Sequence, residues 1–164
     1  MSATSKKPWN PKESPLPPEK THGLEIAAWR YEEIPLGHEC SFERILTFEE
    51  GLAFAKLSGD ANPLHVDSEF GKRSPFGQNV VHGLMLGGLF SKLVGMDCPG
   101  KKSLYVSQSL EFRQPVFYGE KILVKGTVIE KSDALKMITL KTEILKTGQV
   151  AVSGQARVKV LDHA

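Results

Sequence analysis

A carboxylate and an imidazole five positions apart are the feature of the sequence best suited to chemistry. Asp60 and His65 flank an Asn62–Pro63 step in the string Ser-Gly-Asp-Ala-Asn-Pro-Leu-His, residues 58–65. Asp and His are the side chains most often used to move protons near neutral pH. An Asn-Pro step bends the backbone, so both side chains can face one spot without a helix between them. The string therefore predicts an acid/base site carried by a turn.

A second segment, Val80-Val81-His82-Gly83, has the pattern of the start of a long apolar helix. The first N–H groups of a helix have no partner within the helix, and the helix dipole is positive at that end. This end therefore suits a substrate that develops negative charge on oxygen. His82 is more typical of a structural residue with a hydrogen-bonded ring than of a proton carrier.

Local patterns indicate the elements that position these residues. Thr47 and Glu50 have the spacing of a capping box, so we expect a helix directly after Thr47. Gly59 suits the position that ends this helix, which places Asp60 on the loop just beyond it. The next helix, at about 81–95, is apolar nearly all round, which predicts a buried central helix.

The rest of the chain has the alternating pattern of strands. One short strand is expected at 38–46, and four more are expected after the central helix. Their alternating apolar positions lie within residues 104–112, 122–128, 138–144 and 150–160. Hairpin turns are expected at 131–133 and 146–148. This order predicts an α+β domain in which a curved antiparallel sheet wraps a single long helix.

Composition limits the class of protein. The 164 residues are enough for one domain with a core, and 40% hydrophobic and 24% charged residues are typical of a soluble globular protein. A net charge of +2 without a dense basic stripe argues against nucleic acid as a partner. No apolar run approaches the ~18 residues needed to cross a bilayer. Residues 1–22 are rich in proline and are expected to form a disordered or extended tail before a domain at 23–164.

The two cysteines bear on location and on metal binding. Cys40 and Cys98 form no CxxC pair, and no Cys/His spacing fits a zinc site. Two isolated cysteines fit a reducing compartment. The N-terminus also lacks the apolar region of a secretory signal. We therefore expect the cytoplasm.

The string at 58–65 and the segment at 81–85 together resemble the R-specific enoyl-CoA hydratase family (hydratase 2, MaoC-type) of hot-dog proteins. The likeness continues through 107–112 and 115–120 and spans roughly residues 36–160. The resemblance implies a hot-dog fold and a homodimer, with the acyl chain in a tunnel near the subunit boundary. It also implies syn addition of water to a trans-2-enoyl thioester, giving the (R)-3-hydroxyacyl thioester, or the reverse dehydration. The family uses no metal or redox cofactor.

Carried over position by position, the resemblance implies roles for five residues. Asp60 and His65 match the catalytic pair, with Asp60 as base and His65 as acid on one shared water. Asn62 matches the residue that holds the turn and the site water, and Gly83 matches the residue whose backbone N–H binds the thioester oxygen. Ser91 matches a serine on the helix near the aspartate. Asn62 could instead serve only its own turn, and Ser91 could be only a small core residue.

Three alternative functions stay open. A 3-hydroxyacyl-ACP dehydratase would use the same site on a thioester carried by a protein. Acyl carriers are acidic, so such an enzyme should present a basic patch at the tunnel mouth. The candidates for this patch are Lys72, Arg73, Lys101 and Lys102. A non-catalytic thioester-binding subunit would be signalled by loss of Asp60 or His65, and both are present. A thioesterase on the same fold would release free thiol.

Overall fold

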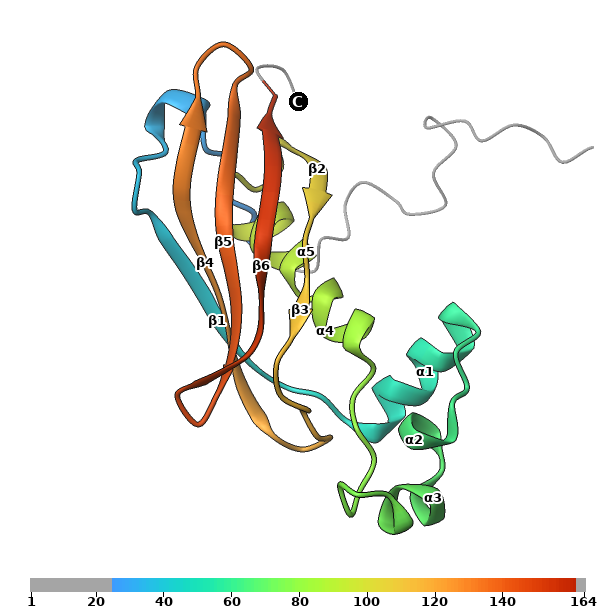
Figure 1. Ribbon diagram of the computed structural model, residues 1–164. Coiled ribbons are helices and arrows are strands. Elements are labelled where there is room, and N and C mark those ends of the chain that lie inside the picture. The colour runs from blue at the N-terminus through green and yellow to red at the C-terminus, as the bar shows by residue number, and fades with distance from the viewer. Residues whose placement is uncertain (1–24, 162–164) are drawn as a thin grey trace, which may run out of the picture.

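The computed structural model describes residues 25–161, which fold into one curved antiparallel sheet with a set of short helices (Figure 1). The strands are β1 (Glu39–Ile45), β2 (Ser103–Gln108), β3 (Glu111–Phe112), β4 (Lys121–Ser132), β5 (Met137–Lys146) and β6 (Gln149–Val160). The helices are the 3-10 turn η2 (Tyr31–Glu33), α1 (Phe48–Ser58), α2 (Pro63–Val66), α3 (Ser68–Arg73), α4 (Gly83–Gly88), α5 (Phe90–Lys92) and the π-helical turn η3 (Leu93–Asp97). The tail predicted at 1–22 and the domain start at residue 23 lie outside the described residues.

The sheet has the order β1-β4-β5-β6-β2, and β3 also pairs with β6. All of these pairings are antiparallel. Along β4, alternate residues are buried, among them Ile122, Val124 and Val128, because successive side chains of a strand point to opposite faces. The predicted α+β class and the curved antiparallel sheet are confirmed. No helix within residues 25–161 has the length and apolar character required to cross a lipid bilayer.

The expected strands are present, with one division that the alternation did not predict. The run at 104–112 forms two strands, β2 and β3, separated at Ser109. There the Ser109 hydroxyl accepts the N–H of Gln155 at 3.0 Å, so a side chain replaces one backbone partner of the ladder. The turn expected at 131–133 begins later, because β4 continues to Ser132. The hairpin at 146–148 is confirmed: Thr147 and Gly148 both have positive φ, as a two-residue turn requires.

The start and the end of α1 follow the predicted capping residues. The Thr47 hydroxyl accepts the N–H of Glu50 at 3.2 Å, and the Glu50 carboxylate accepts the N–H of Thr47 at 2.9 Å. Gly59 ends the helix in the left-handed region, with φ +82°, and its N–H donates to the carbonyl of Ala55. Local hydrogen bonds therefore set the point at which Asp60 leaves the helix.

The central helix is shorter and more interrupted than predicted. It begins at Gly83 instead of residue 81, because Val81 is extended and its N–H donates to the carbonyl of Val116 at 2.8 Å. A turn at Leu89 separates α4 from α5, and the π-helical η3 follows. The expectation of burial all round is wrong: Phe90 and Leu93 are fully buried, whereas Leu84 is 68% exposed.

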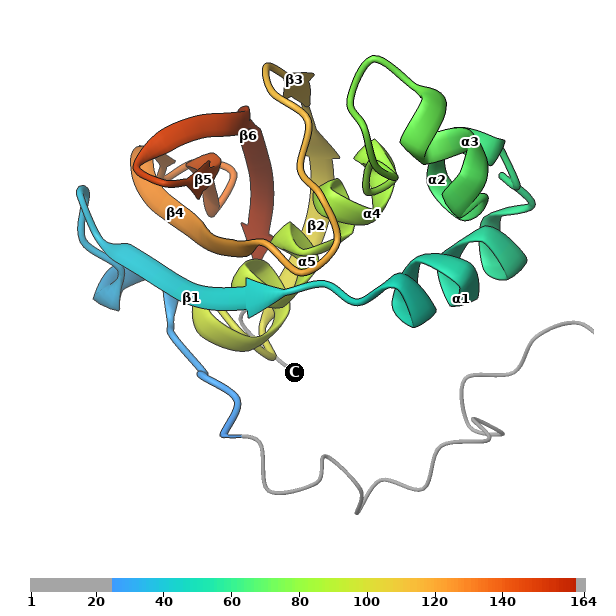
Figure 2. The ribbon, with the colours of Figure 1, turned by 90° about the horizontal axis from the view of Figure 1, so that it is seen from below.

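The position of the sheet explains this one-sided burial. Figure 2 shows the sheet curling around α5 and η3, whereas α4 extends past the sheet toward α1, α2 and α3. We call these three helices, with their connections, the lobe (residues 48–73). Few residues of the three helices are buried, and these are small: Gly51, Ala55 and Gly71. The sheet therefore wraps only the later part of the central helix, and the earlier part borders the lobe.

The close approach of β6 to Ser109 yields a stability prediction. A β-carbon on Gly154 would lie 1.8 Å from the carbonyl oxygen of Ser109, so the backbone would have to shift. We expect Gly154→Ala to lower the free energy of unfolding by about 1–3 kcal/mol in urea denaturation. Gly88→Ala is the control, because its added methyl meets nothing within 4 Å and alanine favours a helix. Wild-type stability of Gly154→Ala would contradict this packing.

Candidate active site

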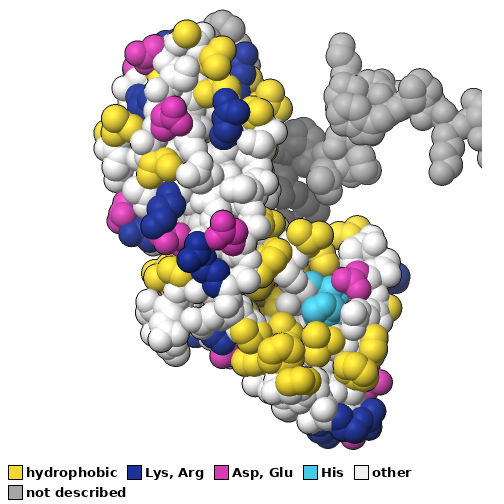
Figure 3. Space-filling view, viewed as in Figure 1, with side chains coloured by type: hydrophobic (Ala, Val, Ile, Leu, Met, Phe, Trp, Pro, Cys, Tyr) yellow, Lys and Arg dark blue, Asp and Glu magenta, His cyan; other side chains and the backbone are white. Residues whose placement is uncertain are grey.

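The lobe and the start of α4 bring a carboxylate and two imidazoles together. One ligand atom from each of Asp60, His65 and His82 lies within 4.8 Å of the other two. Two hydrogen bonds of about 2.8 Å that meet at one water span a separation of this order. Figure 3 shows histidine and acidic side chains adjoining one another on a surface bordered by hydrophobic side chains. The pair predicted from the sequence is therefore close enough to act on one water.

Asp60 is held by short-range contacts of the loop after α1. Its N–H donates to the hydroxyl of Ser58 at 3.2 Å, and that hydroxyl donates to the carbonyl of Phe54 at 2.8 Å. One oxygen of the Asp60 carboxylate accepts the N–H of Asn62 at 3.2 Å. The side chain is otherwise exposed, so the carboxylate is open to solvent and to a substrate.

The Asn-Pro step does more than bend the chain. The Asn62 side-chain oxygen accepts the N–H of Leu64 at 3.0 Å and caps α2, with Pro63 in the first helical position. His65 therefore lies on a short helical turn, which corrects the expectation that no helix stands between the pair. The capping role of Asn62 supports the view of it as a turn residue, and its predicted contact with the site water stays a prediction.

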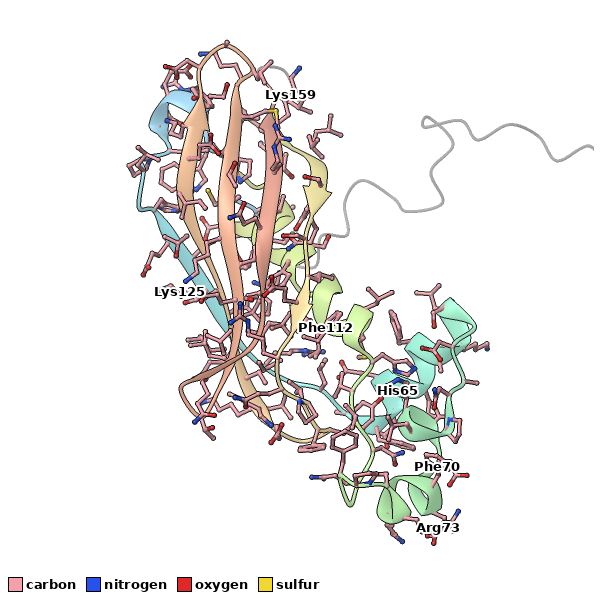
Figure 4. All side chains as sticks on the ribbon, in the orientation of Figure 1. His65, Phe70, Arg73, Phe112, Lys125 and Lys159 are labelled. Atoms are coloured by element: carbon pink, nitrogen blue, oxygen red, sulfur yellow. The ribbon has the colours of Figure 1, made fainter. Side chains whose placement is uncertain are left out.

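The ring of His65 is oriented by a backbone carbonyl from the next segment. Its Nδ1 lies 2.7 Å from the carbonyl oxygen of Val80. A carbonyl oxygen only accepts, so Nδ1 carries a proton and Nε2 is the nitrogen free to act on a substrate. In the neutral ring this Nε2 is an acceptor. Figure 4 shows His65 on the side of the lobe that faces α4, with Phe112 at the adjoining sheet edge.

His82 is buried beside both members of the pair. It is 1% exposed, and its Nε2 lies 2.9 Å from the carbonyl oxygen of Asp60. Its ring stacks on that of His65, with centroids 4.0 Å apart and an interplanar angle of 28°, and the ring of Phe54 lies 5.0 Å away. The structure thus places His82 as a hydrogen-bonded, packed residue, as the sequence indicated.

The three side chains form a poor metal site in spite of their proximity. A bound metal lies in the plane of each imidazole that ligates it, on the lone pair of the nitrogen. The stacked rings of His65 and His82 lie in nearly parallel planes, so their lone pairs do not converge on one point. Tetrahedral zinc at about 2.1 Å from each nitrogen would require one ring to turn out of the stack.

Gly83 lies at the wall of an apolar pocket next to the pair. Its N–H donates to no other group within residues 25–161. A pocket of about 280 Å³ adjoins it, lined in part by His65, Phe76, Gly83, Leu86, Phe112 and Val116. A β-carbon on Gly83 would lie 3.1 Å from the Phe112 ring, so glycine allows this close approach. A wider groove of about 400 Å³ lies elsewhere on the sheet and includes neither Asp60 nor His65 among its lining residues.

Ser91 is not brought into this group by any described interaction. It lies on α5, its side chain is exposed, and its hydroxyl joins none of the side-chain hydrogen bonds found within residues 25–161. Its predicted role near the aspartate stays a prediction. The alternative of a small core residue does not fit an exposed side chain.

Asn79 is a positioning residue that the sequence analysis missed. Its side-chain NH₂ group points at the backbone carbonyls of Leu64 and Asp67, each at 2.9 Å, and of Pro63 at 3.3 Å. The Val80 N–H adds a bond to the Leu64 carbonyl at 3.2 Å. These bonds tie the α2–α3 connection to the segment that carries the Val80 carbonyl. A polar residue directly before an apolar run is the signal that could have drawn attention to it.

The chain is similar in sequence and in overall structure to known proteins. Residues 36–151 match the model of the MaoC like domain family. The (R)-specific enoyl-CoA hydratase of Aeromonas caviae is 38% identical over 128 residues, which are 77% of this chain and 96% of that protein. The solved (R)-hydratase of A. caviae superposes with a TM-score of 0.77, covering 79% of this chain and 98% of its own.

Two further relatives extend the comparison. An R-hydratase structure from Pseudomonas aeruginosa is 26% identical, with a TM-score of 0.80, and covers 84% of this chain and 89% of its own. A mitochondrial 3-hydroxyacyl-[acyl-carrier-protein] dehydratase of Arabidopsis thaliana is 32% identical over 117 residues, 69% of each chain. The chain is thus similar both to proteins named as R-hydratases and to one named as a carrier-protein dehydratase.

The contacts of Asn79 lead to a test of how the site is held. Asn79→Asp keeps the size of the side chain but replaces the NH₂ donor with a carboxylate that faces three carbonyl oxygens. We expect the free energy of unfolding to fall by about 1–3 kcal/mol, because the buried side chain at position 79 loses its hydrogen bonds and its oxygens face carbonyl oxygens that only accept. Thermal and urea denaturation measure the change. Asn10→Asp, outside the described residues, serves as a control for the charge change, and equal stability of the two variants would refute the anchoring role.

Proposed function

The chain belongs to the MaoC-like domain family, and we propose that it catalyses the reversible syn hydration of trans-2-enoyl-CoA to (R)-3-hydroxyacyl-CoA. It is then a hydro-lyase on the hot-dog fold of its relatives. The observation that carries this proposal is the approach of Asp60 and His65 within 4.8 Å, beside an apolar pocket that both His65 and Gly83 line. The sequence identity and the structural similarity to proteins named as (R)-hydratases support it.

Hydration requires a water made nucleophilic toward Cβ and a proton delivered to Cα. Asp60, an exposed carboxylate, takes the proton from the water, and His65 delivers the proton to Cα through Nε2. Because Nδ1–H is engaged with the Val80 carbonyl, this delivery requires the imidazolium form of His65. Both groups act from one side of the alkene, which gives syn addition. Dehydration follows the same path in reverse, with the two roles exchanged.

The thioester oxygen gains negative charge during this reaction. We propose that the Gly83 N–H receives it, since this donor has no partner within residues 25–161 and lies at the pocket wall beside His65. Loss of one such donor typically slows a reaction by about 100–1,000-fold. The chemistry that we propose is acid–base chemistry carried by these side chains and this N–H, and it includes no metal or redox cofactor.

A carrier-protein thioester is the second candidate substrate. A relative named as a carrier-protein dehydratase supports it, and so does a basic pair, Lys72 and Arg73, exposed on α3 in the same lobe as the site. Lys101 and Lys102 lie at the other end of the molecule, where the Lys102 carbonyl accepts the N–H of Leu161. The four basic residues therefore form two separate pairs. Parallel assays with enoyl-CoA and with an enoyl carrier protein decide between the substrates.

We propose a reducing compartment, with the cytoplasm as the expected location. Cys40 and Cys98 are free thiols. Burial raises the pKa of Cys40 to about 11 and that of Cys98 to about 12. Both thiols therefore stay protonated near neutral pH and react slowly, so they suit a compartment in which disulfides do not form.

We also propose a homodimer, with a second copy on the edge formed by β2 and β3. Leu104, Val106 and Phe112 on this edge are each about half exposed, at 52%, 51% and 51%. An edge strand presents unpaired N–H and C=O groups, and contiguous exposed apolar side chains mark interaction sites. Because Phe112 also lines the pocket beside Gly83, a partner at this edge would border the substrate.

The catalytic pair is tested by isosteric replacement. We expect Asp60→Asn and His65→Gln each to lower kcat/KM about 100- to 10,000-fold, the range for loss of a general acid or base. The assay follows loss of the conjugated enoyl absorbance of a short trans-2-enoyl-CoA, with the chirality of the product checked. Asp67→Asn is the control, because Asn keeps the cap that Asp67 provides to α3. Activity in either pair variant like that of the control would refute the assignment.

The assay also separates the alternative functions. Release of free thiol without loss of the alkene would identify a thioesterase. Reaction of the carrier-protein ester alone would identify the dehydratase of fatty acid synthesis. Binding of both esters without any reaction would identify a non-catalytic subunit.

The dimer is tested by a charge placed at the edge. We expect wild-type protein to sediment at twice the chain mass of 18.1 kDa and Val106→Glu to sediment as a single chain. Ile45→Glu is the control, because Ile45 on β1 is similarly exposed, at 50%, but lies on the opposite edge of the sheet. A wild-type single chain would contradict the proposed dimer.

A further inference from the structure

The ring of His82 is the contact that both members of the pair share. Its Nε2 lies 2.9 Å from the carbonyl oxygen of Asp60, and its face stacks on His65 at 4.0 Å. A carbonyl oxygen only accepts, so Nε2 carries the proton and Nδ1 presents a lone pair. The relative position of Asp60 and His65 therefore depends on the orientation and the tautomer of His82.

The remaining nitrogen of His82 faces a phenol from the loop before β4. The hydroxyl of Tyr118 lies 3.5 Å from Nδ1, a long hydrogen bond in which the phenol is the donor. Burial raises the pKa of Tyr118, which keeps this hydroxyl protonated. His82 is 1% exposed, so water has little access to replace this donor.

The phenol occupies space that a missing side chain leaves open. A β-carbon on Gly51 would lie 2.1 Å from the Tyr118 hydroxyl oxygen and 2.5 Å from Cζ of the ring. Gly51 lies in the first turn of α1, and the same turn supplies Phe48, whose ring packs edge-on against Tyr118 at 5.4 Å. The N–H of Gly119 donates to the carbonyl of Leu46 at 2.9 Å and ties the Tyr118 loop to the start of α1.

We propose that Tyr118 is a positioning residue for the hydratase reaction: its phenol, admitted by Gly51, fixes the orientation of the His82 ring and through it the placement of Asp60 against His65. This inference rests on the proposed function and extends it to groups that do not touch the substrate. The connection runs from Tyr118 to Nδ1 of His82, and from Nε2 of His82 to the Asp60 backbone.

The physical consequence of losing the phenol follows from the two nitrogens. Without the phenol, the buried Nδ1 lone pair of His82 has no partner, and the ring loses one of the contacts that hold it in place. The proton stays on Nε2, because the Asp60 carbonyl only accepts. A ring that tilts toward a new partner for Nδ1 carries the Asp60 loop with it and changes the position of Asp60 relative to His65. Substrate binding uses the pocket wall, so the chemical step should suffer and binding should not.

Tyr118→Phe removes this hydroxyl and keeps the ring that packs on Phe48. We expect kcat to fall about three- to tenfold, the effect of one hydrogen bond, with KM unchanged. Tyr105→Phe is the matched control: it deletes a half-buried phenol hydroxyl bonded to Gln108, in the part of the core distant from the lobe. This control should keep the wild-type kcat.

A spectroscopic measurement reads the hydrogen bonding of His82 directly and does not depend on activity. ¹⁵N-labelled histidine should show His82 with its proton on Nε2 in both proteins, and a changed Nδ1 resonance in Tyr118→Phe, where Nδ1 no longer accepts a hydrogen bond. Gly51→Ala is the second variant, because its methyl group displaces the phenol without altering it. It should reproduce both the fall in kcat and the change at His82. Melting temperatures show whether each variant is folded.

The outcomes are distinct. A wild-type kcat and an unchanged His82 Nδ1 resonance in Tyr118→Phe would overturn the proposal. Equal losses of kcat in Tyr118→Phe and Tyr105→Phe would overturn it too, since they would indicate general loosening. If the wild-type protein hydrates no enoyl thioester, the proposed function fails, and the His82 Nδ1 resonance in Tyr118→Phe still decides whether the phenol holds the ring.

Discussion

The site depends on the hydrogen bonds between side chains and backbone carbonyls that join the lobe to residues 79–82. The lobe buries few side chains, so packing alone gives it little stability relative to the sheet. Asn79 donates to carbonyls of the α2–α3 region, and His65 and His82 each approach a carbonyl of the other segment. The buried side chains of Asn79 and His82 would be left without partners if these bonds were lost, which is costly. The same bonds thus hold the lobe and orient the imidazoles.

The residues that stabilise the fold and the residues that would carry out the reaction lie in different parts of the structure. The sheet and the buried face of α5 and η3 form two apolar clusters that both pack against Cys40, with Phe90 and Leu93 fully buried. The pair lies outside that core, on short helical turns that polar contacts hold. A carboxylate such as Asp60 can stay exposed there, open to water and to a thioester, whereas burial in the core would penalise its charge. The core therefore stabilises the fold, and the lobe holds the reactive groups.

The glycines of this chain show how backbone and side chains share space around the site. Gly83 lets the Phe112 ring approach the start of α4, and Gly51 admits the phenol of Tyr118. Each position depends on a partner that comes from a distant part of the chain. A larger residue at either glycine would alter the pocket wall or the ring of His82 without touching Asp60 or His65. Proteins of one family that have the same Asp–His pair can therefore differ in reaction rate because of the residues around that pair.

The sequence by itself determined the features that depend on near neighbours: the capping box of Thr47, the end of α1 at Gly59 and the hairpin at residues 146–148. The spacing of Asp60 and His65 belongs with them, because the turn between them is local. The tertiary structure alone decided the one-sided burial of the central helix, the division of β2 from β3, and the roles of Asn79 and Tyr118. Their partners lie 15 and 36 residues away, beyond the reach of periodicity or spacing. Only packing of the folded chain brings such groups into contact.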